Sequence, residues 1–471
     1  MRKTKIVCTL GPAVTNLDTI REMVAAGMNC ARLNFSHGDY DEHLERVKML
    51  KIAREEQGKF VALMMDTKGP EIRTKAFTAG YVDLKRDDPF TLYCDDTPPS
   101  PRGIGITYPN LCREITVGTR VLLDDGLIEL LVTEIFGEEI RCSVLNGGML
   151  GNNKSINLPG CNIDLPSLTA KDKADIAFAV EHGFDFVAAS FVRKVEDVLA
   201  IRETLDACGG ESVHIISKIE NREGVDNAHA IIAVSDGIMV ARGDLGVEIP
   251  AEEVPGIQKM LIAKCVSAGK PVITATQMLD SMTHNPRPTR AEVSDVANAV
   301  FDGSSCVMLS GETAAGKYPL EAVRTMLRIV CEAESAGQYA YVPACTAGDC
   351  MSISDAISQA ACQTAKNLEA NAILTVTTSG HSARMIARFR PECPIIAVSP
   401  NQKVKRQLGI TWGVKPCAGS DMEHSSDKLF DLGVETARAA GLVKSGDLVV
   451  TVAGFPIGES GTTNQIRVQK A

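Results

Sequence analysis

Short apolar runs alternate with helix-length amphipathic segments through most of the first 340 residues. The segments Lys5–Leu10, Asn29–Ser36 and Phe60–Thr67 are apolar enough to be buried strands, and Leu17–Ala26 and Tyr40–Gln57 between them have the spacing of helices. Strands that are apolar throughout and alternate with helices are typical of parallel sheets covered on both faces. This alternation predicts an α/β protein and limits the possible folds more than any other feature of the chain.

The alternation stops between Pro70 and Pro166. Short β-rich runs in this part are separated by turn sequences such as Asp124-Asp125-Gly126 and Asn146-Gly147-Gly148. Connections inside β/α units usually have only a few residues, so an interruption of this length indicates a separate domain rather than a loop. We therefore predict a small inserted β-barrel domain over residues 70–166.

The alternation returns after Pro166 with five more predicted strands. Three strands before the insertion and five after it make eight, and eight β/α units predict a closed (β/α)8 TIM-type barrel with its active site at the carboxyl ends of the strands. An open doubly wound sheet is the alternative, but the strand count favours a barrel built from residues 1–69 and 167–340. The five later strands are predicted at Asp185–Val192, Val213–Glu220, Gly237–Asp244, Pro271–Met278 and Ser305–Glu312.

A third unit follows the barrel. Small and polar residues at Gln338–Asp349 predict a linker. Beyond it the alternation of helices and strands returns, and residues 350–471 are expected to form a separate C-terminal α/β domain. Its predicted elements are helices at Ile353–Leu368 and Ser382–Arg388, and strands at Ala372–Thr377, Ile395–Val398 and Leu448–Ala453.

The composition excludes several classes of protein. A chain of 471 residues with 45% hydrophobic and 23% charged residues is long enough for several domains with large cores. A net charge of −10 argues against nucleic acid as a partner. The apolar run near the N-terminus is too short for a signal peptide, and no run is long enough for a transmembrane helix. We therefore expect a cytoplasmic protein with no membrane partner.

Several motif-like features point to no special chemistry. The 15 cysteines include no CxxC pair, which indicates reduced thiols rather than a zinc knuckle or a redox motif. His37 and His284 have no partner at metal-ligand spacing and are expected to be hydrogen-bonding loop residues. The segment Gly311–Tyr318 resembles a P-loop but has Tyr where Ser or Thr is needed, so it is predicted to be a turn before a helix. Thr289-Arg-Ala-Glu292 is first of all a capping box, although Arg290 could serve a partner subunit.

The predicted fifth and sixth barrel strands carry charges at their carboxyl ends. Lys218 and Glu220 are two residues apart, so they project from the same face of an extended chain, and Asp244 ends the next strand. A cation and two carboxylates at neighbouring strand ends are costly to bring together unless function uses them. We expect Glu220 and Asp244 to hold a divalent cation and Lys218 to face an anionic substrate. Solvated surface loops are the alternative.

Polar residues also end other predicted barrel strands. Carboxylates without a His or Cys cluster suit Mg²⁺ or Mn²⁺. Several uncharged or singly charged oxygen donors suit a weakly held monovalent ion, and Arg32, Arg73 and Lys218 offer positive charge to phosphate or carboxylate oxygens. This set is what phosphoryl transfer requires, because there the protein mainly positions groups and neutralises charge. The further strand-end residues are Arg32, Asn34, Ser36, Asp66, Thr67, Lys68, Arg73, Thr274 and Thr276.

The chain resembles the pyruvate kinase family of bacterial type over essentially its whole length. The matching motifs are Lys5–Pro12, Arg32–Gly38, Leu63–Arg73, Ile216–Glu220, Met239–Gly246 and Thr274–Leu279. The resemblance implies the last step of glycolysis, in which the phosphoryl group of phosphoenolpyruvate passes to ADP and gives pyruvate and ATP. The alternative is another Mg²⁺-dependent barrel enzyme that handles enolates, such as an aldolase or lyase.

The resemblance also implies roles for individual residues. Glu220 and Asp244 would bind Mg²⁺ or Mn²⁺, and Lys218 would stabilise the phosphoryl group during transfer. Thr276 would lie beside the enolate and help its protonation. The inserted domain would be a lid that excludes water. The remaining implied contacts are Arg32 and the backbone of Gly243 and Asp244 to substrate, Asn34, Ser36, Asp66 and Thr67 to K⁺, and Arg73, Lys154, Asn34 and His37 to the nucleotide.

The segment Pro101-Arg102-Gly103 departs from the family pattern. Many K⁺-dependent members carry a Glu near this point, and a built-in cation can replace the charge of the ion. K⁺ is therefore expected as a cofactor, with Arg102 as the residue that could make it unnecessary.

In the C-terminal domain, the segment Thr377-Thr378-Ser379-Gly380-His381-Ser382 opens a predicted helix after a strand. A helix N-terminus can bind anions, and Gly454–Thr463 is a second Gly-rich and Thr-rich loop. The resemblance implies that this region binds a sugar-phosphate effector, for example fructose 1,6-bisphosphate, and that the enzyme is a homotetramer. His381 stands where some relatives have Lys or Arg, and an ordinary capped helix is the alternative.

Overall fold

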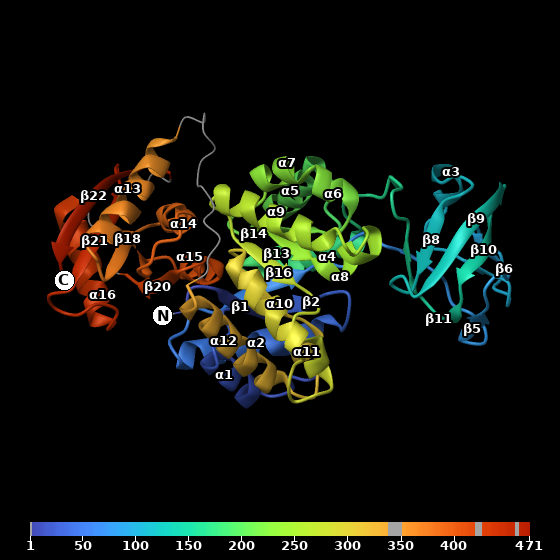
Figure 1. The fold of residues 1–471 in the computed structure, drawn as a ribbon, viewed down its shortest axis with the longest axis horizontal. Helices are drawn as coiled ribbons and strands as arrows, with labels where there is room; N and C mark the ends of the chain where they lie inside the picture. Colours follow the sequence, from blue (N-terminus) through green and yellow to red (C-terminus); the bar gives the residue numbers. More distant parts are fainter. Residues whose placement is uncertain (1, 338–350, 420–425, 457–460) are drawn as a thin grey trace.

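Eight parallel strands close into a barrel at the centre of the molecule (Figure 1). This computed structural model describes residues 2–337, 351–419, 426–456 and 461–471. The barrel closes in the order β1-β17-β16-β15-β14-β13-β3-β2, which confirms the predicted (β/α)8 fold. Its strands are β1 (Lys5–Thr9), β2 (Cys30–Asn34), β3 (Ala62–Asp66), β13 (Phe186–Ala189), β14 (His214–Ile219), β15 (Gly237–Ala241), β16 (Val272–Ala275) and β17 (Cys306–Leu309).

Helices surround the barrel, and polar side chains fix where several of them begin. Asn16, Asp39, Thr169 and Thr289 each accept a hydrogen bond from the first turn of the helix that follows, and the predicted capping box at Thr289 is confirmed. The helices are α1 (Leu17–Ala25), α2 (Tyr40–Glu56), α4 (Ala170–Glu181), α5 (Val195–Ala207), α6 (Arg222–Asp226), α7 (Ala228–Val234), α8 (Arg242–Glu248), α9 (Val254–Ser267), α10 (Arg290–Phe301), α11 (Gly311–Ala314) and α12 (Pro319–Ser335), with the 3-10 helix η1 at Asp280–Thr283.

The barrel strands are shorter than predicted, and a helix begins directly after one of them. The predicted strand Gly237–Asp244 ends at Ala241, and Arg242 already begins α8. The P-loop-like segment forms the short helix α11 and a turn before α12, as predicted. Asp244 therefore lies in the first turn of α8 and not on a strand.

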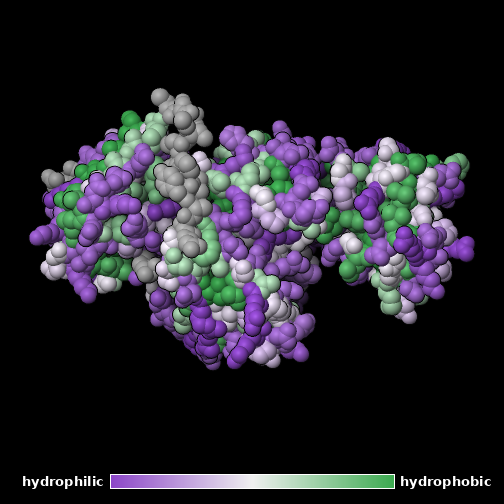
Figure 2. Space-filling model, in the orientation of Figure 1, coloured by the Kyte–Doolittle hydropathy of each residue, from purple (hydrophilic) through white to green (hydrophobic). Residues whose placement is uncertain are grey.

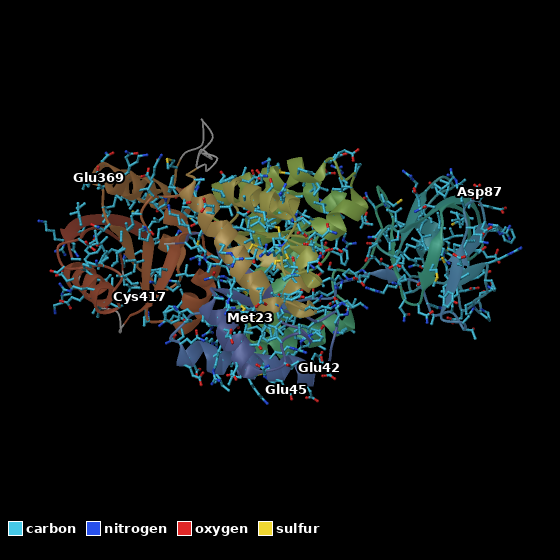
Figure 3. The ribbon with its side chains drawn as sticks, turned by 60° about the horizontal axis from the view of Figure 1, so that its bottom comes forward. Met23, Glu42, Glu45, Asp87, Glu369 and Cys417 are labelled. Atoms are coloured by element: carbon cyan, nitrogen blue, oxygen red, sulfur yellow. The ribbon has the colours of Figure 1, made fainter. Side chains whose placement is uncertain are left out.

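Side chains fill the barrel, and a second apolar layer lies between strands and helices. The interior cluster is Val7, Cys30, Ala62, Met64, Phe186, Ala188, Ile216, Met239, Ile273, Ala275, Cys306, Met308 and Ile410. Met23 of α1 is fully buried in the outer layer, whereas Glu42 and Glu45 of α2 lie on the outer surface (Figure 3). The barrel is thus a solid core that opens to ligands only at its ends.

The inserted domain extends from one side of the barrel (Figure 1). It is a half-barrel with a seven-stranded sheet in the order β4-β12-β8-β9-β10-β6-β7 and a two-stranded sheet of β11 and β5, around its own apolar core. Figure 2 shows apolar atoms among the polar ones on its surface. Its elements are β4 (Ile72–Arg73), β5 (Tyr81–Leu84), β6 (Pro89–Tyr93), β7 (Gly103–Gly105), α3 (Leu111–Glu114), β8 (Arg120–Leu123), β9 (Ile128–Phe136), β10 (Glu139–Asn146), β11 (Gly148–Gly151) and β12 (Ser155–Asn157).

The C-terminal α/β domain lies on the opposite side of the barrel (Figure 1). Its five strands pair in the order β20-β19-β18-β21-β22, and only β22 is antiparallel to its neighbour. The predicted linker at Gln338–Asp349 lies outside the described residues. The elements are α13 (Ile353–Asn367), β18 (Ala372–Val376), α14 (His381–Arg388), β19 (Ile395–Ser399), α15 (Gln402–Gln407), η2 (Leu408–Ile410), β20 (Val414–Ala418), α16 (Ser426–Ala439), β21 (Leu448–Gly454) and β22 (Thr463–Lys470).

The C-terminal domain closes the amino end of the barrel. Ile410, at the end of η2, is fully buried and belongs to the cluster inside the barrel, where the Sγ of Cys306 lies 3.2 Å from its carbonyl oxygen. Arg406 donates to both carboxylate oxygens of the buried Asp185, at 2.9 and 3.0 Å. The two domains therefore share a core, and ligands reach the barrel from its other end.

The thirteen cysteines among the described residues are free thiols. Burial raises the pKa of the Cys142 and Cys265 thiols to about 12, which keeps them protonated. In the described part of the chain, no helix is long and apolar enough to cross a membrane.

Candidate active site at the carboxyl end of the barrel

A cavity of about 680 Å³ lies between the carboxyl ends of the barrel strands and the inserted domain. The inserted domain is held over this end of the barrel by Asn157, which donates to Glu248 of α8 at 2.9 Å. Polar and charged groups from both domains line the cavity. The sequence-predicted residues among them are Arg32, Asn34, Ser36, His37, Arg73, Lys218, Glu220 and Asp244.

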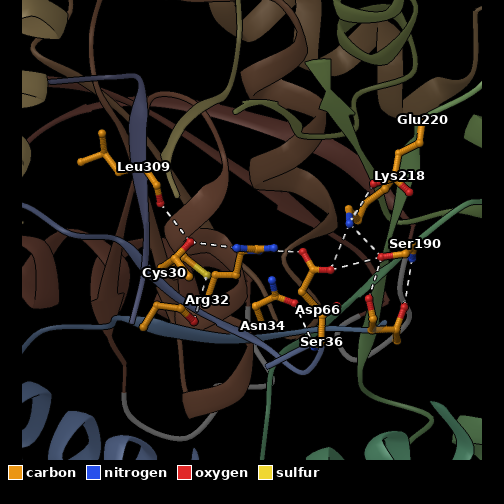
Figure 4. A network of polar contacts seen from close by, with 12 residues as sticks. Cys30, Arg32, Asn34, Ser36, Asp66, Ser190, Lys218, Glu220 and Leu309 are labelled. Carbon is orange, nitrogen blue, oxygen red and sulfur yellow. Dashed lines mark hydrogen bonds and ion pairs between the residues drawn. The ribbon is translucent and has the colours of Figure 1, made fainter. Parts of the chain in front are cut away.

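A chain of ion pairs crosses four neighbouring barrel strands at this end (Figure 4). Arg32 of β2 donates from Nε to Asp66 Oδ2 at 2.6 Å, and Lys218 of β14 donates from Nζ to Asp66 Oδ1 at 3.1 Å. Lys218 Nζ also lies 2.9 Å from Glu220 Oε1. Arg32, Asp66, Lys218 and Glu220 are all at least nine-tenths buried. Charges buried this deeply persist because each has an opposite charge in contact.

The ionisation of this network follows from its contacts. Burial opposes the charged form of Asp66, but Arg32 and Lys218 outweigh it and hold its pKa below the ordinary value. Burial also disfavours the Lys218 ammonium, yet Asp66, Glu220 and Asp244 together raise its pKa above the ordinary value. Lys218 is therefore a fixed positive charge at neutral pH, suited to an anionic substrate.

Of the two carboxylates in the network, Asp66 has a lowered pKa and Glu220 a raised one. Burial raises the pKa of Glu220 to about 7, with Asp244 adding to the effect and Lys218 opposing it. Its Oε2 accepts a hydrogen bond from Phe191 N at 2.5 Å, while Oε1 has the ion pair with Lys218 but no hydrogen bond of regular geometry. A buried carboxylate oxygen without a regular hydrogen-bond donor has a lone pair for a metal ion, which would share Oε1 with Lys218.

The donors present fit a hard divalent cation. No group of three or more His, Cys, Asp or Glu side chains converges anywhere in the described ranges, so a closed zinc-type centre is not found there. Glu220 and Asp244 supply two carboxylates facing one cavity. Mg²⁺ commonly binds through one or two protein carboxylates and takes its other oxygens from water and substrate phosphates.

Thr276 lies in a turn directly after β16. Its Oγ1 accepts a hydrogen bond from Gly243 N at 2.7 Å and donates to Ala275 O at 2.6 Å. Thr276 and Gln277 both have positive φ angles, of 67° and 54°, which is unusual for residues other than glycine. Thr276 does not line the cavity directly, although its contact with Gly243 places it one residue from Asp244.

Arg242 holds this turn in place. Its guanidinium donates to Thr276 O at 2.7 Å, to Ala275 O at 3.2 Å and to Asp295 of α10 at 2.8 Å. Three acceptors from two elements thus fix the strained backbone around Thr276. Arg242 is not among the residues that the sequence predicts for the site.

The oxygen donors predicted for a monovalent ion come from β2, β3 and the loops that follow them. Asn34 pairs in register with Asp66, and Asn34 Oδ1 accepts from Ser36 N at 3.1 Å. Thr67 is buried, with its Oγ1 accepting from Ser190 N at 3.0 Å. His37 is exposed at the cavity rim, and its carbonyl oxygen contacts His43 Nε2 at 3.0 Å.

Two of the four predicted nucleotide contacts, Arg73 and Lys154, belong to the inserted domain. Arg73 lines the cavity and donates to Glu71 Oε2 at 2.6 Å and to Asn153 O at 2.7 Å. Lys154 is paired with Asp124 at 2.9 Å and does not line the cavity. The structure therefore brings Arg73 to the site and leaves Lys154 beside it, on the same domain.

Arg102 lies on the surface of the inserted domain. It is exposed on the inserted domain, where its backbone N–H donates to Ser100 Oγ at 3.1 Å, and it does not line the cavity. Whether a cation at this position replaces the monovalent ion stays a prediction. Glu71, which the sequence analysis left without a role, does line the cavity.

Ser190 is another cavity residue that sequence reasoning missed. It directly follows β13, and its Oγ contacts Lys218, Asp66 and Thr67. The signal was present, because Ser190 is a polar residue near the end of a predicted apolar strand. A single serine in that position is too common to be informative alone.

The segment predicted to bind an effector lies at the start of α14. Thr377 Oγ1 accepts from Gly380 N at 2.9 Å, Ser382 Oγ contacts Thr463 Oγ1 at 2.6 Å, and His381 Nε2 contacts Ser354 Oγ at 3.3 Å. Thr378 and Ser379 are partly exposed beside them. The middle of the neighbouring loop Gly454–Thr463, residues 457–460, lies outside the described part of the chain.

Comparison with known proteins covers nearly the whole chain. A family model described as the barrel domain of pyruvate kinase matches residues 1–323, and one described as its alpha/beta domain matches residues 355–469. Pyruvate kinase of Geobacillus stearothermophilus is 51% identical over 470 residues, covering 99% of this chain and 80% of the relative. Pyruvate kinase of Clostridium acetobutylicum is 50% identical over 471 residues, covering 100% and 99%. The chain therefore belongs to the pyruvate kinase family of enzymes.

Proposed function

We propose that the cavity between barrel and inserted domain binds phosphoenolpyruvate and ADP, and that the chain transfers the phosphoryl group from the first to the second. The observation that carries this proposal is the buried Arg32–Asp66–Lys218–Glu220 network. It brings two positively charged side chains, Arg32 and Lys218, and the carboxylate proposed to bind the metal, Glu220, to one cavity. Phosphoryl transfer depends on positioning and on neutralising charge, and this network supplies both.

Each cavity residue has a place in this proposal. Glu220 and Asp244 would hold Mg²⁺ or Mn²⁺, which neutralises phosphate and carboxylate oxygens when bound. Lys218 faces the phosphoryl group during transfer, and Arg32 binds the phosphate of the substrate. The backbone of Gly243 and Asp244 would contact the substrate, and Thr276 would assist protonation of the enolate.

The nucleotide and the monovalent ion are assigned next to this centre. Arg73, which lines the cavity, would contact phosphates of ADP, and Lys154 would join it once the inserted domain moves toward the barrel. Asn34 and His37 border the nucleotide on the barrel side. A K⁺ ion bound by Asn34, Ser36, Asp66 and Thr67 is consistent with the oxygen donors found there.

The direct test is a coupled assay of ATP formation. Purified protein is given phosphoenolpyruvate and ADP with Mg²⁺, and pyruvate is detected through its reduction by lactate dehydrogenase. Omitting Mg²⁺ should abolish turnover, and replacing K⁺ by tetramethylammonium at equal ionic strength should lower it. Absence of pyruvate with every substrate and metal present would refute the proposed reaction.

For the C-terminal domain, we propose a sugar-phosphate effector at Thr377–Ser382. The Thr and Ser hydroxyls and the N-terminus of α14 support it, because together they offer donors to a phosphate group. We also propose a homotetramer, from the family alone. Isothermal titration with fructose 1,6-bisphosphate tests the effector, with Thr378→Ala as the variant expected to lose binding, and light scattering after gel filtration tests the assembly.

A further inference from the structure

Ser190 stands at the junction of the proposed monovalent-ion site and Lys218. Its Oγ accepts a hydrogen bond from Lys218 Nζ at 2.7 Å, which is the shortest hydrogen bond that this ammonium makes. The same Oγ lies 2.7 Å from Thr67 O and 3.2 Å from Asp66 Oδ1. Ser190 is buried, yet it lines the cavity. Figure 4 shows it beside Lys218 and Asp66.

A serine hydroxyl has one proton to donate and two lone pairs. At Ser190 one lone pair receives the Lys218 ammonium, so the single proton must be given either to Thr67 O or to Asp66 Oδ1. Both of these oxygens belong to residues that we assign to the monovalent ion. A cation that binds them competes with the hydroxyl proton, and thereby changes how strongly Ser190 can hold Lys218.

The surrounding backbone keeps Ser190 fixed in this position. Its N–H donates to Thr67 Oγ1 at 3.0 Å, and Thr67 N donates to Ala188 O at 3.0 Å. Gly69 has a φ of 73°, and a Cβ there would lie 2.9 Å from the Ser190 Cβ, so only glycine lets the two segments approach this closely. Behind the turn, Gly69 N donates to the fully buried Asp172 at 3.0 Å.

Lys218 needs a neutral partner of this kind. Its two other contacts are the carboxylates Asp66 and Glu220, which lie on different strands and attract the ammonium in different directions. A hydroxyl in a fixed position sets the direction of the ammonium without adding charge, whereas a third carboxylate would compete with the substrate anion.

We infer that Ser190 is a positioning residue that orients Lys218 and transmits occupancy of the monovalent-ion site at Asp66 and Thr67 to it. The inference rests on the proposed function, since it assigns a further residue to the same reaction. Ser190 acts through Lys218 and need not contact the phosphoryl group.

The test compares Ser190→Ala and Ser190→Cys with wild type and with the control Ser217→Ala. Ser217 is fully buried on β14, and its hydroxyl contacts Ser235, so the control removes the same atom from the same barrel without touching the network. Ser190→Cys keeps the volume of the side chain but replaces the hydroxyl by a weak hydrogen-bonding group, and serves if the alanine variant does not fold.

Both Ser190 variants are expected to lower kcat about 10- to 100-fold, as for loss of a hydrogen bond to a charged group. The KM for phosphoenolpyruvate should change less than about threefold, because the groups that bind the ground state remain. A second readout does not depend on turnover. In Mg²⁺ and oxalate, an enolate mimic, replacing tetramethylammonium by K⁺ should raise the Tm of wild type and Ser217→Ala, and the Ser190 variants should show less than about half of that rise.

The inference is overturned if the Ser190 variants keep the kcat of Ser217→Ala, if KM rises while kcat is unchanged, or if their Tm responds to K⁺ as the control does. A wild type that makes pyruvate but responds to K⁺ in neither measurement also overturns it. A wild type that makes no pyruvate refutes the proposed function itself, and is thereby distinguished from the other results.

Discussion

The ammonium of Lys218 lies 2.9 Å from the carboxylate of Glu220, two residues further along the same strand end. The group proposed to face the phosphoryl and a group proposed to bind the metal are thus paired with each other. A divalent cation at Glu220 would compete with Lys218 for this carboxylate, and would turn the ammonium toward the cavity. The ion pair between Lys218 and Glu220 therefore links metal binding to the orientation of the Lys218 ammonium toward the substrate.

Lys218→Met should abolish turnover while leaving substrate binding largely intact. The methionine keeps most of the length of the side chain but removes the charge that stabilises the transferring phosphoryl, which predicts a loss in kcat of at least about 10³-fold. The coupled assay measures kcat, and protection of the variant by phosphoenolpyruvate in a thermal-shift titration measures binding. Turnover close to that of wild type would exclude the proposed role.

Divalent-ion affinity in the absence of substrate should rise with pH up to about 7 and then level off. Burial raises the pKa of Glu220 to about 7, so protons compete with the metal for this carboxylate below that pH. Each pH unit below 7 should weaken Mn²⁺ binding by up to about tenfold, and the change above pH 8 should be small. The affinity for Mn²⁺ is measured at pH 6, 7 and 8 from the electron paramagnetic resonance signal of the free ion.

Glu220→Gln is the control for this titration. The amide cannot lose a proton in this range, so its Mn²⁺ affinity should be weak and should show a shallower dependence on pH. Equal wild-type affinities at pH 6 and pH 8 would show that Glu220 is already ionised at pH 6.

Arg242→Ala should lower kcat about 10- to 100-fold with a smaller change in KM. Two consecutive residues with positive φ, Thr276 and Gln277, each cost on the order of 1–3 kcal/mol, and Arg242 is the side chain that holds the carbonyl oxygens of this turn. Arg242→Lys should not restore activity, because one ammonium cannot reach the three acceptors at once. Arg141→Ala, which removes an exposed arginine, is the control expected to keep wild-type kcat.

Much of the barrel site could be predicted because the fold puts strand ends together. Lys218, Glu220 and Asp66 were expected at one end of the barrel from the strand count alone, and the structure joins them through ion pairs. Which residues of the inserted domain line the cavity could not be predicted, because a position in sequence does not reveal which face of a domain meets the barrel. Ser190 was missed because its importance lies in three contacts from other strands, none of them visible in its own segment.

Strands β20 and β22 of the C-terminal domain were not predicted, and the reasons lie in their own sequences. Strand β20 contains Pro416 and is an edge strand, and the other edge strand, β22, consists mostly of polar residues and is largely exposed or half-buried. In contrast, the neighbouring residues Gly409 and Thr411 do not predict that the Ile410 side chain packs inside the barrel. Burial of that side chain is decided by how two domains meet, which is information that no local pattern contains.

Ile410→Ala should destabilise the protein by about 2–5 kcal/mol, the usual cost of emptying a buried isoleucine site. The side chain fills the amino end of the barrel interior together with Val7 and Cys306, and the cavity left behind cannot close without moving strands. Ile353→Ala makes the same change in the same domain at a side chain that is 72% exposed, and should cost less than about 0.5 kcal/mol. Urea unfolding followed by tryptophan fluorescence of Trp412 measures both. Because the proposed active site lies at the opposite end of the barrel, Ile410→Ala should keep its kcat at 25 °C, and equal unfolding midpoints for the two variants would show that Ile410 does not support the barrel.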